Sequence, residues 1–307
     1  MAELETEIET ETETETVTEK VTEKKKKHLV DQFIVLPILT YVLILLSGVP
    51  QYFVAALLAP LSVKIPDLTS LVHYFSTLGY WVVFLLFMAI YKPDRPLIRS
   101  LFTGKTNTWK FFLIGLGVGL VTNGSCILVS VLHQDISLYF DPSSVPLLIL
   151  CFLAVIIQSG SEELICRHFM QQHLRRRYQK PWLEILLPGF FFAALHLFNP
   201  GISVIAVINL VVCGILLGAS VYYFDSMWFV IGFHTMWNYT QNVIFGLPNS
   251  GIVLPLSIFR LDAASGRDSF SYNAAFGVEG SLMALLVQAV ALFFVIFLGK
   301  KKKSPNR

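Results

Sequence analysis

Residues 145–168 read VPLLILCFLAVIIQSGSEELICRH, an apolar stretch that carries two adjacent glutamates and an arginine. A transmembrane helix needs about 20 apolar residues, and a charged side chain at bilayer depth costs at least ~2.5 kcal/mol. Such side chains usually face the interior of a helix bundle and serve a function there. Glu162, Glu163 and Arg167 therefore indicate a functional site inside a membrane protein.

The composition of the whole chain supports a membrane protein. Of its 307 residues, 54% are hydrophobic and only 14% are charged, whereas soluble domains contain about 45–50% apolar and 25% charged residues. We predict an all-α, polytopic membrane protein with about eight transmembrane helices, embedded in a lipid bilayer and without a nucleic-acid partner. The predicted spans are Phe33–Ala59, Leu71–Tyr91, Trp109–Leu132, Val145–His168, Trp182–Phe198, Ile202–Phe224, Met227–Leu247 and Val278–Leu298.

Lysine and arginine are distributed unevenly between the two sides of this arrangement. If the N-terminus is inside, only Lys64, Arg260 and Arg267 of the 23 Lys and Arg residues lie on the outer side. Cytoplasmic loops of membrane proteins carry an excess of Lys and Arg. We therefore predict a multi-pass protein of the cell membrane with both termini in the cytoplasm.

Three parts of the chain differ in composition. Residues 1–28 are a Glu/Thr-rich run followed by a lysine block, and we predict a disordered cytoplasmic tail because too few apolar residues offset the entropy of folding. Residues 29–299 form the predicted transmembrane helical domain, with a motif-bearing core at 145–247, and residues 300–307 form a basic cytoplasmic tail. The longest connection, Pro248 to Gly277, is either a plain loop or a lid.

Helix geometry predicts different roles for the two glutamates. Consecutive side chains on an α-helix point about 100° apart, so Glu162 and Glu163 cannot aim at one spot. Residues four apart lie over one another, and Glu163 therefore pairs with Arg167. Glu162 is left as the free carboxylate, with Gln158 one turn before it on the same face.

Two further apolar segments carry polar residues at helical spacing. Phe192 lies one turn before His196 in the fifth predicted span. The seventh carries a polar stripe at three- and four-residue spacing, formed by His234, Asn238, Gln241 and Asn242. One free glutamate, two histidines and an asparagine on neighbouring helices predict a catalytic or ion-handling site.

Three motifs thus occur in order on separate predicted helices: Glu162-Glu163-x-x-x-Arg167, Phe192-x-x-x-His196 and His234-x-x-x-Asn238. They resemble the three motifs of the CAAX protease and bacteriocin-processing family of intramembrane proteases, abbreviated CPBP and also called the Abi family. The resemblance covers about Val145 to Leu247. It implies an enzyme that hydrolyses a peptide bond of a membrane-associated protein or peptide, either a prenylated CAAX tail or a secreted peptide.

The resemblance also implies a role for each matched residue. Glu162 and His196 would activate the attacking water, and His234 and Asn238 would stabilise the oxyanion or bind a metal. Glu163, Arg167 and Phe192 would support the site. A metal-dependent site would hold Zn2+ through Glu162, His196 and His234 with water as fourth ligand, whereas a glutamate-dependent site without metal needs the same residues.

Two other classes of function remain open from the residues alone. A non-catalytic membrane scaffold of the same fold would bind a partner protein through an inherited site. A transporter also places Glu, His and Asn within membrane helices, but the sequence shows no inverted repeat and no matching pair of broken helices. Both alternatives are less favoured than the protease.

Overall fold

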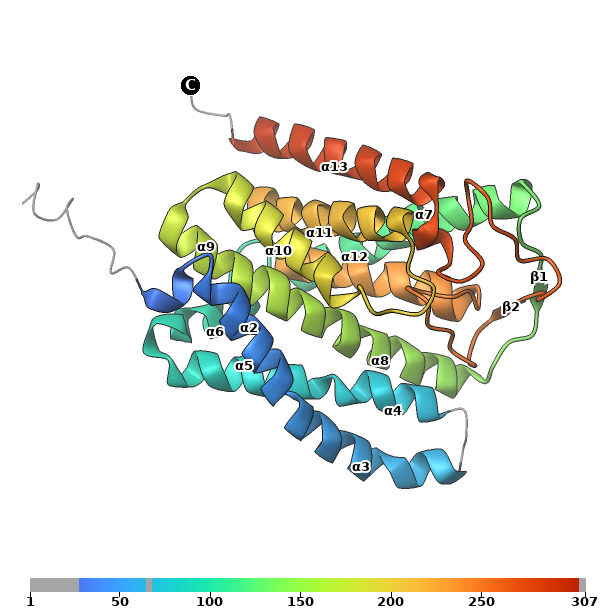
Figure 1. The fold of residues 1–307 in the computed structure, drawn as a ribbon, viewed down its shortest axis with the longest axis horizontal. Coiled ribbons are helices and arrows are strands. Elements are labelled where there is room, and N and C mark those ends of the chain that lie inside the picture. Colours follow the sequence, from blue (N-terminus) through green and yellow to red (C-terminus); the bar gives the residue numbers. More distant parts are fainter. Residues whose placement is uncertain (1–27, 65–67, 304–307) are drawn as a thin grey trace, which may run out of the picture.

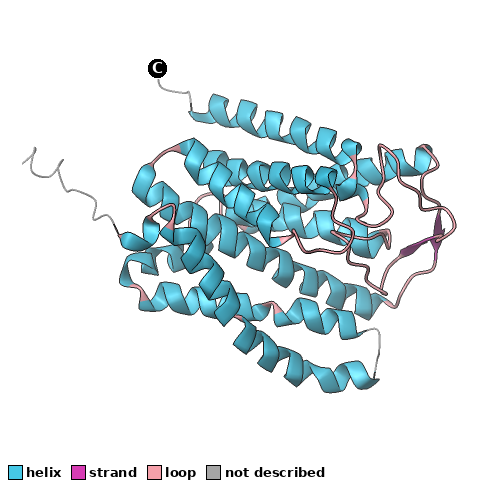
Figure 2. Cartoon of the chain, in the orientation of Figure 1, coloured by secondary structure: helices cyan, strands magenta, loops and turns pink. Residues whose placement is uncertain are grey.

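Helices account for about three quarters of the described chain. The computed structural model describes residues 28–64 and 68–303. Its long helices lie side by side in one bundle, with a two-stranded sheet at one end (Figures 1 and 2). The predicted all-α, polytopic class is confirmed. Residues 1–27 of the predicted N-terminal tail and residues 304–307 lie outside the described residues.

The elements follow the chain in two groups. The first group is η1 (Leu29–Asp31), α2 (Val35–Leu46), α3 (Gly48–Lys64), α4 (Thr69–Ser76), α5 (Leu78–Ile90), η3 (Lys92–Asp94), α6 (Arg95–Phe102), α7 (Trp109–Leu132) and β1 (Leu138–Phe140). The second is α8 (Val145–Glu163), the π-helix η4 (Leu164–Met170), α9 (Gln171–Tyr178), α10 (Pro181–Leu195), α11 (Val204–Phe224), α12 (Met227–Tyr239), the π-helix η5 (Thr240–Ile244), β2 (Phe259–Leu261), η6 (Val278–Gly280) and α13 (Leu282–Lys303). β1 and β2 pair antiparallel.

The described residues contain six helices that are long and apolar enough to cross a membrane. They are Val35–Val63, Thr69–Ile90, Trp109–Leu132, Val145–Tyr178, Val204–Phe224 and Leu282–Lys301. The predicted count of eight is not confirmed. α10 has only 15 residues, and α12 interrupts its apolar sequence with His234 and Asn238. Both ends of the described chain lie at the same end of the bundle (Figure 1).

The fourth predicted span is longer than expected. α8 passes into η4 and then α9 without a break, so one helical segment of 34 residues runs from Val145 to Tyr178. Glu162 lies near the middle of this segment, as a site at bilayer depth requires. The turn that follows Glu163 is π-helical, and such wider turns are frequent at functional sites.

A buried ionic cluster anchors the end of this long segment. Arg176 of α9 contacts the carboxylate of Asp31 at 2.5 Å and that of Asp94 at 2.8 Å, and His173 lies 3.0 Å from Asp94. Burial alone would raise the pKa of Asp94, but the interactions with His173 and Arg176 outweigh it and hold this pKa below its usual value. The cluster joins three parts of the chain that are distant in sequence.

α7 and α12 approach closely because glycines lie where they cross. A Cβ atom at Gly115 of α7 would overlap the carbonyl oxygen of Phe229, and one at Gly232 of α12 would overlap that of Phe112. Small residues at helix interfaces allow this approach of two backbones. The contact fixes the level of α12 in the bundle and with it the position of His234, two residues after Gly232.

We expect Gly115→Ala to destabilise the protein more than Gly117→Ala. The new Cβ at position 115 meets a backbone carbonyl that cannot rotate away, and such overpacking costs about 1–3 kcal/mol. At Gly117 nothing lies within 4 Å of the Cβ position, and Gly→Ala in a helix interior stabilises by roughly 0.5–1 kcal/mol. Thermal unfolding in detergent measures the difference. Equal unfolding temperatures for the two variants would contradict the close packing of α7 and α12.

Candidate active site

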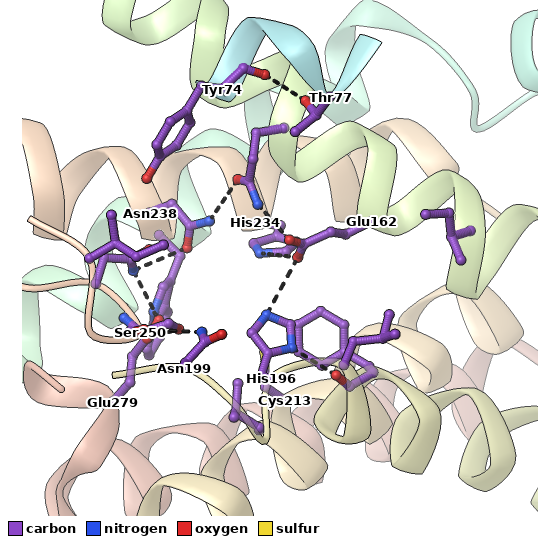
Figure 3. A pocket seen from close by; sticks show the side chains of 18 of the residues that line it. Tyr74, Thr77, Glu162, His196, Asn199, Cys213, His234, Asn238, Ser250 and Glu279 are labelled. Atoms are coloured by element: carbon purple, nitrogen blue, oxygen red, sulfur yellow. Dashed lines mark hydrogen bonds and ion pairs between the residues drawn. The ribbon is translucent and has the colours of Figure 1, made fainter. Parts of the chain in front are cut away.

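The four residues with predicted catalytic roles line one cavity of about 350 Å3 inside the bundle. Glu162 comes from the end of α8, His196 from the end of α10, and His234 and Asn238 from α12. Figure 3 shows the carboxylate of Glu162 facing the imidazole rings of both histidines. The structure therefore brings together side chains from three helices that are separate in sequence.

The free carboxylate lies within water-bridging distance of both imidazoles. Oε2 of Glu162 is 3.7 Å from Nε2 of His234 and 4.0 Å from Nε2 of His196. Both distances exceed a direct hydrogen bond, and a polar gap of this size accommodates a bridging water. The other oxygen, Oε1, accepts a hydrogen bond of 2.5 Å from Nε2 of Gln158, one turn earlier. The side chain of Glu162 is 20% exposed, so solvent reaches it.

His196 lies at the C-cap of α10, one residue beyond the last residue of the helix. The helix ends at Leu195 because the chain turns at Asn199-Pro200-Gly201. Nδ1 of His196 lies 2.7 Å from the carbonyl oxygen of Phe192. Since a carbonyl can only accept, Nδ1 carries a hydrogen, and Nε2 is the nitrogen that faces Glu162.

Glu163 contacts the opposite nitrogen of the same imidazole that Glu162 faces. Its Oε1 lies 2.8 Å from Nδ1 of His234, while Nε2 of the same ring is directed toward Glu162. Helix geometry alone did not predict this, because it treated the glutamates as pointing to unrelated places. The two carboxylates instead reach opposite sides of one ring.

The predicted ion pair between Glu163 and Arg167 is present and completely buried. Nη1 of Arg167 donates to Oε1 of Glu163 at 3.1 Å, with both side chains 0% exposed. Nη2 donates to the carbonyl oxygen of Gly214 at 3.2 Å. The guanidinium carbon also lies 4.7 Å from the ring centre of Phe192, at which distance a cation–π interaction is favourable. Phe192 and the pair thus form the support beneath the two histidines.

The amide of Asn238 is oriented by a chain of hydrogen bonds. Its Nδ2 lies 3.2 Å from Oγ of Ser159 and 3.4 Å from Oε1 of Gln158. Its Oδ1 accepts from Nδ2 of Asn249 at 3.3 Å, and the same Nδ2 donates to Oε1 of Glu279 at 3.1 Å. Because an ionised carboxylate can only accept, Glu279 fixes the direction of the Asn249 amide. Asn238 is therefore left with its donor atom toward Gln158.

Residues 144–240 match the family model described as type II CAAX prenyl endopeptidase Rce1-like. The matched range contains all three motifs that converge on the cavity. The chain carries an Rce1-like protease domain. No curated protein matches the chain.

The outer segment Pro248 to Gly277 lies against the π-helix η5, which begins at the end of the matched range. Gln241 donates to the carbonyl oxygen of Pro248 at 2.5 Å, and Asn242 donates to that of Ile252 at 2.9 Å. In the predicted polar stripe, Gln241 and Asn242 therefore hold this segment, while His234 and Asn238 line the cavity. Three residues of the segment, Asn249, Ser250 and Ile252, form part of the cavity wall. The segment is thus more than a plain connection.

Two cavity residues outside the Rce1-like domain were missed by sequence reasoning. Glu279 accepts hydrogen bonds from Nε1 of Trp237 at 2.8 Å and from the backbone nitrogen of Ser250 at 2.9 Å. Its only signal in the sequence is an acidic residue just before the last apolar stretch. Gln288 has a clearer signal, because it is the single polar residue between Leu282 and Leu298.

The donor atoms of the Rce1-like site do not form a preorganised metal site. Among the described residues, no three His, Cys, Asp or Glu side chains are arranged to hold a metal ion. The candidate ligands Glu162, His196 and His234 nevertheless present donor atoms of the kinds that Zn2+ takes, with the carboxylate 3.7 and 4.0 Å from the two nitrogens.

Proposed function

We propose that the chain is an intramembrane endopeptidase that cleaves a peptide bond of a membrane-associated substrate, with Glu162 as the general base. The observation that carries the proposal is the position of this carboxylate between the Nε2 atoms of His196 and His234. It lies in a cavity near the middle of the helical segment Val145–Tyr178. The Rce1-like domain supports a protease.

In the proposed reaction Glu162 takes a proton from a water molecule held between its carboxylate and the imidazoles. The water oxygen forms a bond to the carbonyl carbon of the substrate, and a tetrahedral oxyanion results. Nε2 of His196 accepts a hydrogen bond from the water and orients it. General-base catalysis of this kind contributes about 10²–10⁴-fold to the rate.

His234, protonated on both ring nitrogens, and Asn238 are proposed to stabilise the oxyanion. Nδ2 is the donor atom of Asn238, because Asn249 occupies its Oδ1, and the oxyanion would replace the hydrogen bond of 3.4 Å from this Nδ2 to Gln158. Donors placed in advance where charge develops lower the barrier, since no reorganisation is needed during the reaction. The proton on Glu162 then moves to the nitrogen of the leaving amine as the carbon–nitrogen bond breaks. Glu162 returns to its starting form.

A prenylated CAAX tail is the proposed substrate. The description of the matched family refers to CAAX prenyl endopeptidases, and a lipidated tail would reach the cavity from the membrane. Arg175, Arg176 and Arg177 of α9 lie at the end of the bundle that also holds both ends of the described chain (Figure 1). An excess of positive charge marks the cytoplasmic side. We therefore place this end in the cytoplasm and the protein in the cell membrane.

Cleavage of a farnesylated, internally quenched CAAX peptide by the purified protein in nanodiscs tests the proposal. We expect release of a C-terminal peptide, identified by mass spectrometry. A parallel comparison of membrane and secreted peptides from cells with wild type or Glu162→Gln identifies other substrates. If no peptide depends on Glu162 and the variant still restores a deletion phenotype, the chain is a scaffold.

Metal dependence is tested on the same preparation. We propose a glutamate-dependent reaction, in which the carboxylate of Glu162 takes the proton from water without the help of a metal. The protein is expected to contain no stoichiometric zinc and to retain its cleavage rate after treatment with a chelator. One zinc per chain, lost together with activity and restored by added zinc, would replace this mechanism with a metal-dependent one.

A further inference from the structure

Helix α13 buries one amide side chain that the fold does not use. Gln288 is the single polar residue between Leu282 and Leu298, is 3% exposed and lines the cavity. Its Oε1 has no hydrogen-bond partner among the described residues. An unpaired amide in an apolar interior lowers stability, so an apolar residue would suit the helix better. The amide therefore needs an explanation other than packing.

A second amide with an unpaired oxygen lies on the neighbouring helix α11. Nδ2 of Asn209 donates to the carbonyl oxygens of Glu279 at 2.8 Å and Ser281 at 2.9 Å. These two bonds fix the orientation of the amide, because both partners can only accept. Oδ1 is thus the free atom, and it has no partner although the residue is only 1% exposed. Asn209 lines the same cavity as Gln288.

These two amides lie on a different wall from the proposed catalytic groups. α11 and α13 pack against each other, and Cys213, one turn after Asn209 on α11, also lines the cavity. The catalytic groups come from α8, α10 and α12. A bound substrate that reaches Glu162 can therefore contact the α11–α13 wall with another part of its chain.

The chemistry of this wall selects the kind of ligand. Among the described residues that line the cavity there is no Lys or Arg, while Glu162 and Glu279 contribute carboxylates, so an anionic group is disfavoured. Oδ1 of Asn209 can accept a hydrogen bond, and the amide of Gln288 can both donate and accept. These two side chains therefore match a neutral ligand group that carries both N–H and C=O. The backbone of a peptide has this composition.

We infer that Asn209 and Gln288 form a subsite that binds the peptide backbone of the substrate, at a position away from the cleaved bond. Oδ1 of Asn209 accepts a backbone N–H, and the amide of Gln288 pairs with a backbone N–H and C=O. This inference rests on the proposed function. To that function the inference adds two residues that determine how tightly the peptide substrate binds.

Peptide binding to a variant that cannot cleave tests the subsite. The probe is a fluorescent farnesylated CAAX peptide, measured by fluorescence anisotropy with Glu162→Gln protein in nanodiscs. Adding Gln288→Met, which keeps the length and volume of the side chain, is expected to weaken binding about tenfold, equivalent to ~1.4 kcal/mol. In the active protein the same change is expected to raise KM about tenfold and to leave kcat within threefold.

Thermal stability separates a binding role from a structural one. If Gln288 serves the ligand, Gln288→Met unfolds at the same temperature as the parent or at a higher one, because an unpaired polar group has been removed. Gln288→Asn is expected to recover part of the affinity. Leu286→Met is the matched control on the same helix, since Leu286 is 59% exposed and its replacement should leave binding unchanged.

Three results would overturn the subsite. They are equal binding by the Gln288→Met and parent proteins, no binding to the parent, and a lowered unfolding temperature of Gln288→Met. Failure of the proposed function has a different signature. In that case Glu162→Gln would cleave as wild type, while binding of the peptide could still depend on Gln288.

Discussion

Glu162→Gln is expected to lower peptide cleavage about 10²–10⁴-fold without changing the unfolding temperature. The substitution keeps the size of the side chain and a polar group toward Gln158, but removes the base that takes the proton from water. Loss of a general base costs about 10²–10⁴-fold. The fold should tolerate the change, because Glu162 is partly exposed and lies 3.7 and 4.0 Å from the two imidazoles. Cleavage of the farnesylated peptide and thermal unfolding are measured on the same preparation.

Glu184→Gln provides the matched control for the loss of a carboxylate. Glu184 is a buried glutamate of α10 that pairs with Arg175 at 2.8 Å, and it does not line the cavity. Its replacement should leave kcat unchanged even if stability falls. Residual cleavage above one tenth of the wild-type rate in Glu162→Gln would contradict the general-base role.

Contacts within one helix were predictable from the sequence. The pairing of Glu163 with Arg167 and the approach of Gln158 to Glu162 both follow from four-residue spacing, and both are present at hydrogen-bond distance. The span Trp109–Leu132 also has the predicted bounds, because its apolar sequence is flanked by clear polar turns. Local periodicity is sufficient for features of this kind.

Contacts between helices could not be predicted in the same way. The position of His234 between the two glutamates depends on how closely α12 approaches α7 and α8, which the glycine contacts determine. The sequence predicted too early an end for the fourth span. Arg176 lies beyond that predicted end, and its charge is neutralised by Asp31, 145 residues earlier in the chain. Glu279 joins the site only through the path of the outer segment. Each of these features requires the three-dimensional arrangement.

Glu163→Ala is expected to lower the yield of folded protein sharply. Glu163 and Arg167 are both fully buried, and removing one partner of a buried pair leaves an uncompensated charge, which costs about 3–5 kcal/mol. Domains are stable by only about 5–15 kcal/mol, so a loss of this size leaves little folded protein. Fluorescence-detected size-exclusion chromatography and thermal unfolding measure the effect. An unfolding temperature equal to that of wild type would contradict the structural role.

The double variant Glu163→Leu with Arg167→Met separates the support of the fold from the support of catalysis. Replacing both members of a buried pair by apolar residues is often neutral or stabilising, so folded yield and unfolding temperature are expected to recover. Cleavage is not expected to recover, because His234 has lost the carboxylate that lies 2.8 Å from its Nδ1 and orients its ring. If the double variant regains both stability and the wild-type kcat, Glu163 does not orient His234, and its role is confined to neutralising Arg167.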